Sequence, residues 1–231
     1  MDRRLSGIVF TVIFSIAFCN SCVGNFFADS KAFFTAFLNA PKKVGSVIPS
    51  SSFLANAMTR YVQRKDAPIK VLEVGAGTGA LTKTIAARMG EGDLFDVIEI
   101  DPDLCDVLRD KFKNNKNVKV HCISISDWNP QYNYDFIVSS VPFNSFRSGT
   151  VKTILDKYEA LIKPRGIISY VALIFMSSAK KIFSMGEKRA DFLKNIAFRR
   201  EFRKKFEFDR DFVFLNIPAA WVYHLQVVKK D

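Results

Sequence analysis

Residues 71–79 read VLEVGAGTG, and residues 97–101 read VIEID. The first stretch is an apolar strand that runs into glycines, and residues 81–89 have the pattern of a helix. Glycine lets the main chain turn tightly and approach a ligand closely, because no Cβ atom intervenes. The second stretch is another strand, whose acidic end follows the glycines at about 20 residues, the spacing of a nucleotide-binding unit. Residues 71–101 therefore predict a strand–loop–helix–strand unit that binds a nucleoside cofactor.

Two glutamates in this unit distinguish between cofactors. Glu99 lies at the tip of the second strand, where an acidic side chain can accept both ribose hydroxyls. Glu73 directly precedes the glycine loop, where a carboxylate would repel the pyrophosphate of NAD but suits a sulfonium compound with an ammonium group. The glycines alone do not exclude NAD, since Ala80 fits the looser dinucleotide fingerprint. The glutamates favour S-adenosylmethionine.

Strands and helices alternate along the chain. Residue patterns predict strands at 69–74, 95–100, 118–123, 136–139, 167–173, 206–215 and 221–228, and helices at 26–40, 50–64, 81–89, 102–112 and 151–162. This alternation predicts an α/β fold with a mostly parallel, doubly wound sheet flanked by helices. We expect one domain at residues 25–231, which includes an N-terminal amphipathic helix.

Residues 1–24 form a hydrophobic, signal-like segment. Arg3 and Arg4 precede an apolar run at residues 5–18, which at roughly 14 residues is short for a membrane span of about 20. The segment fits an export signal, a membrane anchor or a start site set too far upstream. Export would separate the protein from a cofactor made in the cytosol, so we expect a cytoplasmic protein that associates peripherally with the inner face of the membrane.

The chain is basic, with 34 Lys and Arg against 23 Asp and Glu and a net charge of +11. This excess favours an anionic membrane or nucleic acid as a partner, or indicates only a solvated basic surface. Basic residues crowd residues 180–205, with phenylalanines between them. The four cysteines and two histidines form no zinc pattern, so we expect reduced thiols and no metal.

Residues 71–101 resemble motifs I and II of the class I S-adenosylmethionine-dependent methyltransferases. That resemblance implies a Rossmann-like, mostly parallel seven-stranded sheet. It implies that Glu99 holds the ribose and that Ile100 packs on the adenine, while Ser124 stands where an acid often approaches the adenine amine. The other cofactor contacts that it implies are Val47, Ser50, Glu73, Gly75, Ala76, Gly77, Gly79 and Ser139.

The segment after the fourth predicted strand separates two families of such enzymes. Ribosomal RNA adenine dimethyltransferases carry Asn-Leu-Pro-Tyr there, whereas residues 139–143 of this chain read SSVPF. Phe143 keeps a ring, but Ser140 replaces the asparagine, and a hydroxyl lacks the paired donor and acceptor of an amide. RNA adenine methylation therefore remains only the alternative function.

Two further segments resemble the bacterial phospholipid N-methyltransferases, which convert phosphatidylethanolamine towards phosphatidylcholine. They read PKKVGSVIPSS at 41–51 and LNIPAAWVY at 215–223. We therefore interpret the chain as a phospholipid N-methyltransferase; a non-catalytic basic protein on the same fold would instead bind no cofactor. The expected catalytic residues are Ser140, Pro142 and Phe143, and the expected lipid contacts are Lys42, Lys43, Phe33, Phe37, Arg199 and Arg203.

Overall fold

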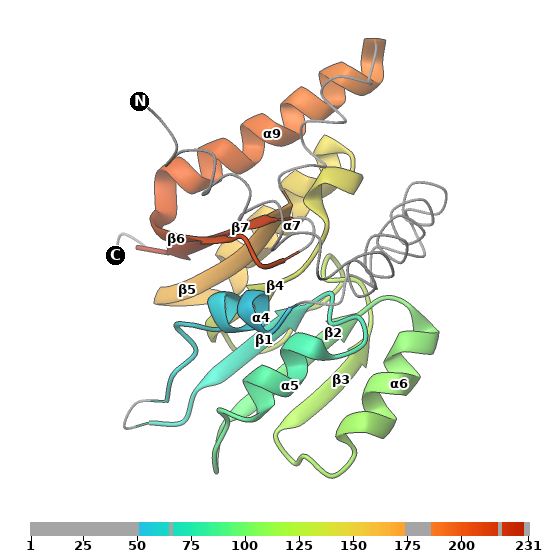
Figure 1. Ribbon diagram of the computed structural model, residues 1–231, viewed down its shortest axis with the longest axis vertical. Coiled ribbons are helices and arrows are strands. Elements are labelled where there is room, and N and C mark those ends of the chain that lie inside the picture. Colours follow the sequence, from blue (N-terminus) through green and yellow to red (C-terminus); the bar gives the residue numbers. More distant parts are fainter. Residues whose placement is uncertain (1–50, 65–66, 174–185, 217–218, 229–231) are drawn as a thin grey trace, which may run out of the picture. The chain divides into compact units, whose positions relative to one another are not determined.

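The computed structural model describes residues 51–64, 67–173, 186–216 and 219–228. They form a seven-stranded sheet in the order β3-β2-β1-β4-β5-β7-β6 (Figure 1). Strands β1 to β5 are mutually parallel, and β7 is antiparallel to both of its neighbours. The strands are β1 (Lys70–Val74), β2 (Leu94–Glu99), β3 (Val118–Cys122), β4 (Tyr134–Ser139), β5 (Ile162–Leu173), β6 (Glu207–Val213) and β7 (Ala220–Gln226). The predicted Rossmann-like, mostly parallel sheet is confirmed.

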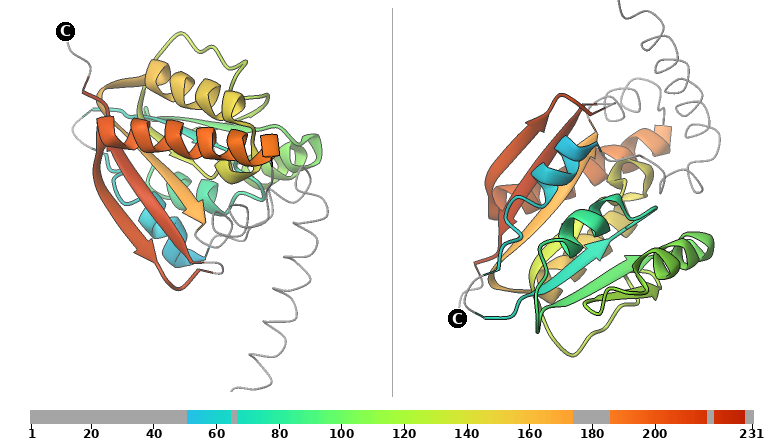
Figure 2. Two further views of the ribbon diagram at one scale, coloured as in Figure 1. Left: turned by 90° about the horizontal axis from the view of Figure 1, so that it is seen from above. Right: turned by 60° about the horizontal axis from the view of Figure 1, so that its bottom comes forward.

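Helices cover both faces of this sheet (Figure 2). Helices α4 (Ser52–Met58), α5 (Ala80–Ala86) and α6 (Pro102–Phe112) lie on one face, and α7 (Ser148–Leu161) and α9 (Gly186–Phe206) lie on the other. The central strands are consequently buried on both sides, as Leu72, Ile137 and Ile168 show, all of which are fully buried. This double burial explains why these strands are continuous apolar runs in the sequence.

Helix α9 is absent from the sequence prediction, which describes residues 180–205 only as basic and aromatic. Its buried residues are Phe192, Asn195, Arg199, Phe202 and Phe206. They recur every three or four positions, which is helical spacing. Because two of the five are polar and the other faces are densely charged, the apolar stripe is hard to see in the sequence.

Strand direction decides which residues share an edge of the sheet. We call the edge where β1, β2, β4 and β5 end the carboxyl edge, and the opposite one the amino edge. Two successive antiparallel pairings make β6 run in the same direction as β1. Val213, at the end of β6, therefore lies at the carboxyl edge with the glycine loop, whereas Glu207 lies at the amino edge.

A disulfide joins α6 to β3. It links Cys105 and Cys122, whose Cα atoms are 5.8 Å apart. The expectation of reduced thiols is therefore wrong for this pair. The two cysteines are separated by 17 positions, and only the packing of α6 beside β3 brings them together.

All described residues belong to one compact unit, Gly45–Asp231. The predicted segment at residues 1–24 and the predicted helix at 26–40 lie outside the described residues. Within the described part of the chain, no helix is both long enough and apolar enough to span a membrane.

Candidate active site

The glycine loop lies at the carboxyl edge, between β1 and α5. Gly75, Gly77 and Gly79 have φ angles of 77°, 58° and 80°, which residues with a side chain rarely adopt. At Gly79 a Cβ atom would also lie 2.8 Å from the ring of Phe112 and 2.9 Å from Leu108. The sequence therefore needs glycine here both for backbone conformation and for the close approach of α6.

Glu99 ends β2 beside this loop and is nearly buried. Its Oε2 accepts a hydrogen bond from the Gly77 main-chain N–H at 2.8 Å, and its Oε1 accepts from Ile100 at 2.8 Å and from Asp101 at 3.1 Å. A carboxylate has about four acceptor positions, so the main chain occupies most of them. To hold a ribose as predicted, the carboxylate must exchange some of these bonds for the hydroxyls.

The predicted adenine contacts lie beside Glu99. Ile100 is 70% exposed, so its side chain is available to pack on a purine ring. Ser124 follows β3 at the same edge, and its Oγ accepts a hydrogen bond from the Ser126 N–H at 3.2 Å. Ile123 donates its main-chain N–H to the Glu99 carbonyl at 3.0 Å, which holds this turn against the end of β2.

The carboxyl group of Glu73 is buried in the site without ordinary hydrogen-bond partners. Its side chain is completely buried in β1, directly before the glycine loop, and neither carboxyl oxygen has a protein hydrogen-bond partner of ordinary geometry. Burial raises its pKa from 4.5 to about 8; the nearby Thr82 hydroxyl opposes this shift, and the charge of Glu99 adds to it. A buried carboxyl group without a partner fits the cationic methionine end of S-adenosylmethionine, which would stabilise its ionised form.

Ser140 connects the end of β4 to the glycine loop. Its hydroxyl donates a hydrogen bond to the main-chain oxygen of Gly75. The preceding Ser139 is fully buried, and its Oγ accepts a hydrogen bond from the Tyr158 hydroxyl at 2.7 Å. The Ser139 side chain therefore faces the core rather than the predicted cofactor contact, whereas Ser140 contacts the glycine loop directly.

Phe143 does not face an acceptor. Its ring is 2% exposed and contacts Tyr158 and Tyr170, with ring centroids 6.4 and 5.4 Å apart. Its predicted place among the catalytic residues is therefore corrected to a core position. Pro142 directly precedes it, at the start of the short 3-10 helix η1 (Phe143–Ser145). Phe146 is instead the exposed ring of this segment, at 37%.

Helix α9 holds the segment after β4 in place. Asn195, which is fully buried, donates its side-chain N–H groups to the main-chain oxygens of Phe143 at 2.8 Å and Phe146 at 3.0 Å. Asp191 accepts from the Ser148 hydroxyl at 2.5 Å and from its main-chain N–H at 3.2 Å, which ties the start of α7 to α9. No local pattern in the sequence predicts these contacts.

A cavity of about 570 Å³ opens between this segment and the start of α9. This volume lies in the range of small-molecule sites. The residues that line it include Asn144, Phe146, Arg147, Glu187, Lys188 and Asp191. Cationic and acidic side chains are both present, so the cavity suits a zwitterionic headgroup.

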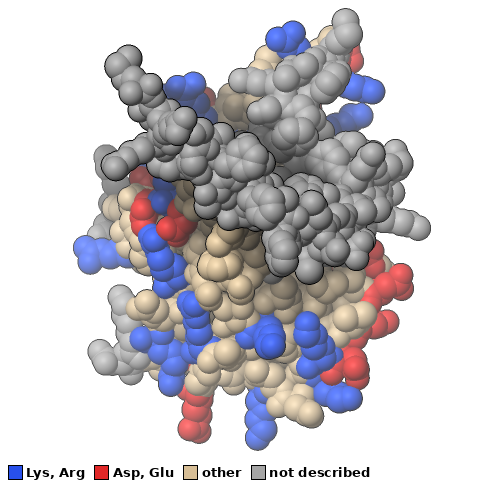
Figure 3. All heavy atoms as spheres, viewed as in Figure 1, with Lys and Arg blue, Asp and Glu red and all other residues tan. Residues whose placement is uncertain are grey.

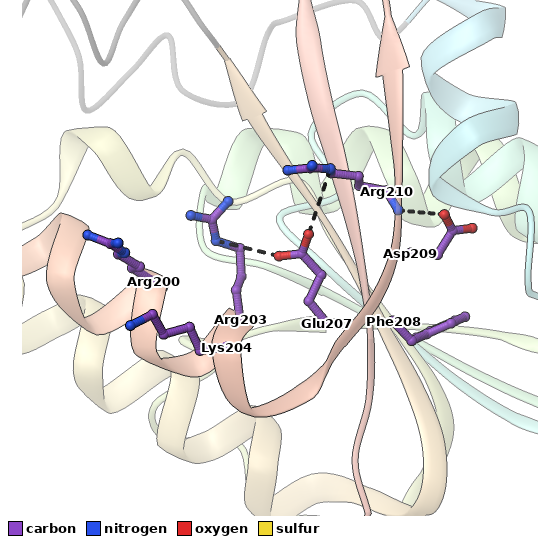
Figure 4. A pocket seen from close by; sticks show the side chains of 7 residues that line it. All are labelled: Arg200, Arg203, Lys204, Glu207, Phe208, Asp209 and Arg210. Carbon is purple, nitrogen blue, oxygen red and sulfur yellow. Dashed lines mark hydrogen bonds and ion pairs between the residues drawn. The ribbon is translucent and has the colours of Figure 1, made fainter.

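The predicted basic lipid contacts on α9 lie elsewhere. Figure 4 shows Arg203 beside a cavity of about 550 Å³ at the start of β6, where Glu207 approaches Arg203 at 3.9 Å and Arg210 at 4.0 Å. This cavity is near the amino edge, and a seven-residue strand such as β6 spans about 20 Å. Arg203 is therefore remote from the glycine loop, and it packs over the ring of Tyr223 at 4.2 Å.

Arg199 is also unsuited to direct lipid contact. It is buried in the face of α9 that packs on the sheet, and this burial lowers the pKa of its guanidinium group. The burial of Arg199 thus corrects its predicted role, whereas the membrane contact of Arg203 stays a prediction. On the face shown in Figure 3, Lys and Arg are spread over the described surface rather than gathered into one patch.

The remaining predicted site residues are outside the described residues. They are Val47 and Ser50 for the cofactor, and Lys42, Lys43, Phe33 and Phe37 for the lipid. One contact nevertheless joins the two segments that resemble the lipid enzymes. The main-chain N–H of Ser51 donates to the Asn216 side-chain oxygen at 3.3 Å, across 165 positions of sequence.

Neither histidine is placed as a catalytic base. His121 Nε2 lies 2.7 Å from Asp96, and His224 is buried between Asp211 at 3.0 Å and Ser169 at 2.8 Å. In the described part of the chain, no three His, Cys, Asp or Glu side chains gather as a metal site would require.

Known methyltransferases resemble this chain in sequence. Residues 71–166 match the family described as "Methyltransferase domain". The chain is 29% identical over 149 residues to the ornithine lipid N-methyltransferase of Singulisphaera acidiphila, a match that covers 62% of this chain and 77% of that protein. It is also 29% identical over 118 residues to a malonyl-[acyl-carrier protein] O-methyltransferase of Acetivibrio thermocellus, covering 50% of this chain and 40% of that protein.

Solved structures share the fold. The N-methyltransferase NodS from Bradyrhizobium japonicum, in complex with S-adenosyl-L-homocysteine, superimposes with a TM-score of 0.58 at 13% identity, and the match covers 79% of this chain and 91% of that one. A Burkholderia thailandensis 1,6-didemethyltoxoflavin-N1-methyltransferase gives the same TM-score at 13% identity over 89% and 90% of the two chains.

Proposed function

We propose that this chain, a methyltransferase whose methyl donor is S-adenosylmethionine, methylates the amine of a membrane lipid headgroup, with phosphatidylethanolamine as the expected substrate. The observation that carries the proposal is the cavity after β4, because it offers cationic and acidic side chains together at the segment that follows Ser140. An amino-lipid headgroup carries the same two charges, an amine and a phosphate or carboxylate. The likeness to an ornithine lipid N-methyltransferase supports the same class of acceptor.

The carboxyl edge supplies the groups that would hold the cofactor. Glu73 would pair with the ammonium group, Glu99 would accept from the ribose, and Ile100 would cover one face of the adenine. When bound, S-adenosylmethionine supplies a methyl group that is electrophilic because it is attached to a positively charged sulfur. The chain's own contribution is then to align the acceptor and exclude water.

Ser140 is positioned to orient the acceptor amine. Because its hydroxyl proton is already directed at the Gly75 carbonyl, its oxygen lone pairs remain free to accept an N–H of the amine. The amine must be neutral to react, so its extra proton is lost to water beforehand. With the cofactor bound, the neutral nitrogen would accept its methyl group, and the methylated amine would then lose a further N–H proton to solvent.

Arg147 and Lys188 would hold the anionic part of the headgroup. Both line the cavity, Arg147 from the position just before α7 and Lys188 from the first turn of α9. A guanidinium group and an ammonium group both form charge-assisted hydrogen bonds to phosphate or carboxylate oxygens. They replace Arg199 and Arg203 in this role, and peripheral contact with the inner membrane face stays part of the proposal.

The RNA alternative loses its structural motive. It rested on the net charge of +11, which an anionic lipid surface also explains, and on an aromatic ring that stacks on a flipped adenine. The ring at the predicted position, Phe143, is buried in the core. RNA therefore enters only as a competing substrate in the test.

The test offers labelled S-adenosylmethionine together with vesicles of phosphatidylethanolamine, an ornithine lipid, phosphatidylcholine and an RNA pool. We expect label in mono- and dimethylated phosphatidylethanolamine and none in RNA. The Arg147→Gln and Lys188→Gln variants should each raise KM for the lipid by about tenfold to a hundredfold, as loss of a charge-assisted bond of about 1.5–3 kcal/mol predicts, with unchanged cofactor affinity. Lys113→Gln, an exposed change directly after α6, is the matched control. Intact cofactor binding without any labelled lipid would refute the proposal.

A further inference from the structure

Four large apolar side chains are exposed together where α4 meets the end of β6. Phe53 is 57% exposed, Phe212 50%, Phe214 74% and Leu215 61%. Scattered apolar residues are normal on a protein surface, but a contiguous group of this size marks a binding site or a liability. Left uncovered, this group would promote aggregation, because β6 is the edge strand of the described sheet and exposed apolar edge strands pair with other chains.

These side chains line a groove of about 540 Å³ between α4 and β6. Its apolar wall consists of Phe53, Ala57, Phe212, Val213, Phe214 and Leu215. One end of the groove is polar, because Arg60 pairs there with Asp211 at 2.6 Å. The groove is therefore apolar towards the carboxyl edge and closed by an ion pair further along β6, which suits a hydrocarbon chain that enters from the carboxyl edge.

The groove lies at the same edge of the sheet as the cofactor loop. Val213 ends β6 at the carboxyl edge, and β6 is three strands away from β4 in the sheet order. Neighbouring strands lie about 4.8 Å apart, so the groove is about 14 Å from the end of β4. An extended chain advances about 1.2 Å per covalent bond. Some twelve bonds thus separate the two positions, about the path from a headgroup amine to the first carbons of an acyl chain.

We infer that this groove binds an acyl chain of the acceptor lipid while the headgroup amine lies at Ser140. The inference rests on the proposed lipid substrate and adds a second, hydrophobic determinant of specificity. It also explains why aromatic and aliphatic side chains are exposed on α4 and β6 at the carboxyl edge. Acceptors with longer chains should bury more methylene groups in the groove and react more efficiently until it is filled.

The experiment measures kcat/KM for phosphatidylethanolamines with chains of four to ten carbons, each presented below its micelle concentration. One fully buried methylene is worth about 0.8 kcal/mol, or about fourfold, so even partial burial gives a rise of tenfold or more across the series. The Phe214→Ser and Leu215→Ser variants should lose most of this rise while keeping their activity on the shortest lipid. Phe214→Leu should retain it.

Val228→Ser is the matched control, because Val228 is a similarly exposed apolar side chain, at 68%, beyond the end of β7 at the amino edge. A flat chain-length profile in the unmodified protein would overturn the groove assignment while leaving lipid methylation intact. If the serine variants lose activity only on vesicles, the patch docks on the bilayer surface, and the acyl-chain assignment is wrong. If the serine variants instead lose thermal stability while the chain-length profile is unchanged, another segment of the chain covers the patch. That result also overturns the acyl-chain assignment. Absence of methylation of every lipid would refute the proposed function itself.

Discussion

Replacing Glu73 by glutamine removes a buried carboxyl group and keeps its shape, which tests the central electrostatic feature of the site. Because burial raises the pKa of this carboxyl from 4.5 to about 8, the folded protein holds a proton that the unfolded chain releases above pH 4.5. The stability cost of this group is therefore absent at low pH, grows as the pH rises above 4.5, and levels off above pH 8.

The size of this cost follows from the shift in pKa. One pKa unit corresponds to 1.36 kcal/mol, so the cost is about 3 kcal/mol at pH 7 and about 5 kcal/mol at pH 9. Glu73→Gln should therefore raise the free energy of unfolding of the cofactor-free protein by about these amounts, and by nearly nothing at pH 4. Urea denaturation at the three pH values measures this, with the exposed Glu91→Gln as control.

Cofactor binding should show the opposite effect of the same substitution. Because its pKa is about 8, the carboxyl is mostly protonated at pH 7, so its pairing with the cofactor's ammonium group should release about 0.9 proton per molecule bound. Calorimetric titration with S-adenosylhomocysteine in buffers of different ionisation enthalpy measures that number. Glu73→Gln should release none and bind at least tenfold more weakly. Equal affinity, together with no proton release by the unmodified protein, would refute the assignment.

Three other predictions concern the framework of the site. Cys122→Ser removes a crosslink that closes a loop of 17 residues and should lower the free energy of unfolding by about 3 kcal/mol in oxidising buffer; an equal loss in dithiothreitol would contradict this. Gly79 has a left-handed backbone conformation, and Gly79→Ala would place a Cβ atom against Phe112. The substitution should lower the free energy of unfolding by about 1–3 kcal/mol, measured by thermal melting, and an unchanged melting temperature would count against this packing. Asn195→Ala leaves main-chain oxygens without their donor and should cost about 1–3 kcal/mol; kcat/KM for lipid should fall while cofactor affinity is retained, and loss of both would argue for general unfolding.

Local patterns in the sequence predict most of the cofactor side of the site. The glycines, Glu73 and Glu99 are each recognisable because they occur at set positions relative to strands that local apolar runs reveal. Their conformations then agree with the prediction, as the positive φ angles of the glycines show. The sequence does not show that Glu99 is already bonded to three main-chain N–H groups, because these bonds depend on how the loop closes.

The acceptor side is less predictable because it depends on packing between distant elements. Phe143 and Phe146 are three residues apart and chemically identical, yet one ring is buried and the other is exposed. Charge alone favours Arg203 as a partner of lipid phosphate, but strand order places it near the amino edge. Asn195 holds the segment after β4 by hydrogen bonds to the main-chain oxygens of Phe143 and Phe146. The sequence does not predict these bonds, because Asn195 lies on α9, whose buried face is partly polar.

The sequence by itself determines the strand–loop–helix–strand unit, the seven strands and the positions of the two acidic groups proposed to hold the cofactor, because each is encoded in residues close together in the chain. Only the tertiary structure decides which side chains share the carboxyl edge, which aromatic ring is exposed, that Cys105 meets Cys122, and that an apolar groove lies beside the site. The physical reason is that these features depend on contacts between distant segments. For the groove, two antiparallel pairings at the end of the sheet set the direction of β6, and no local sequence pattern predicts that direction.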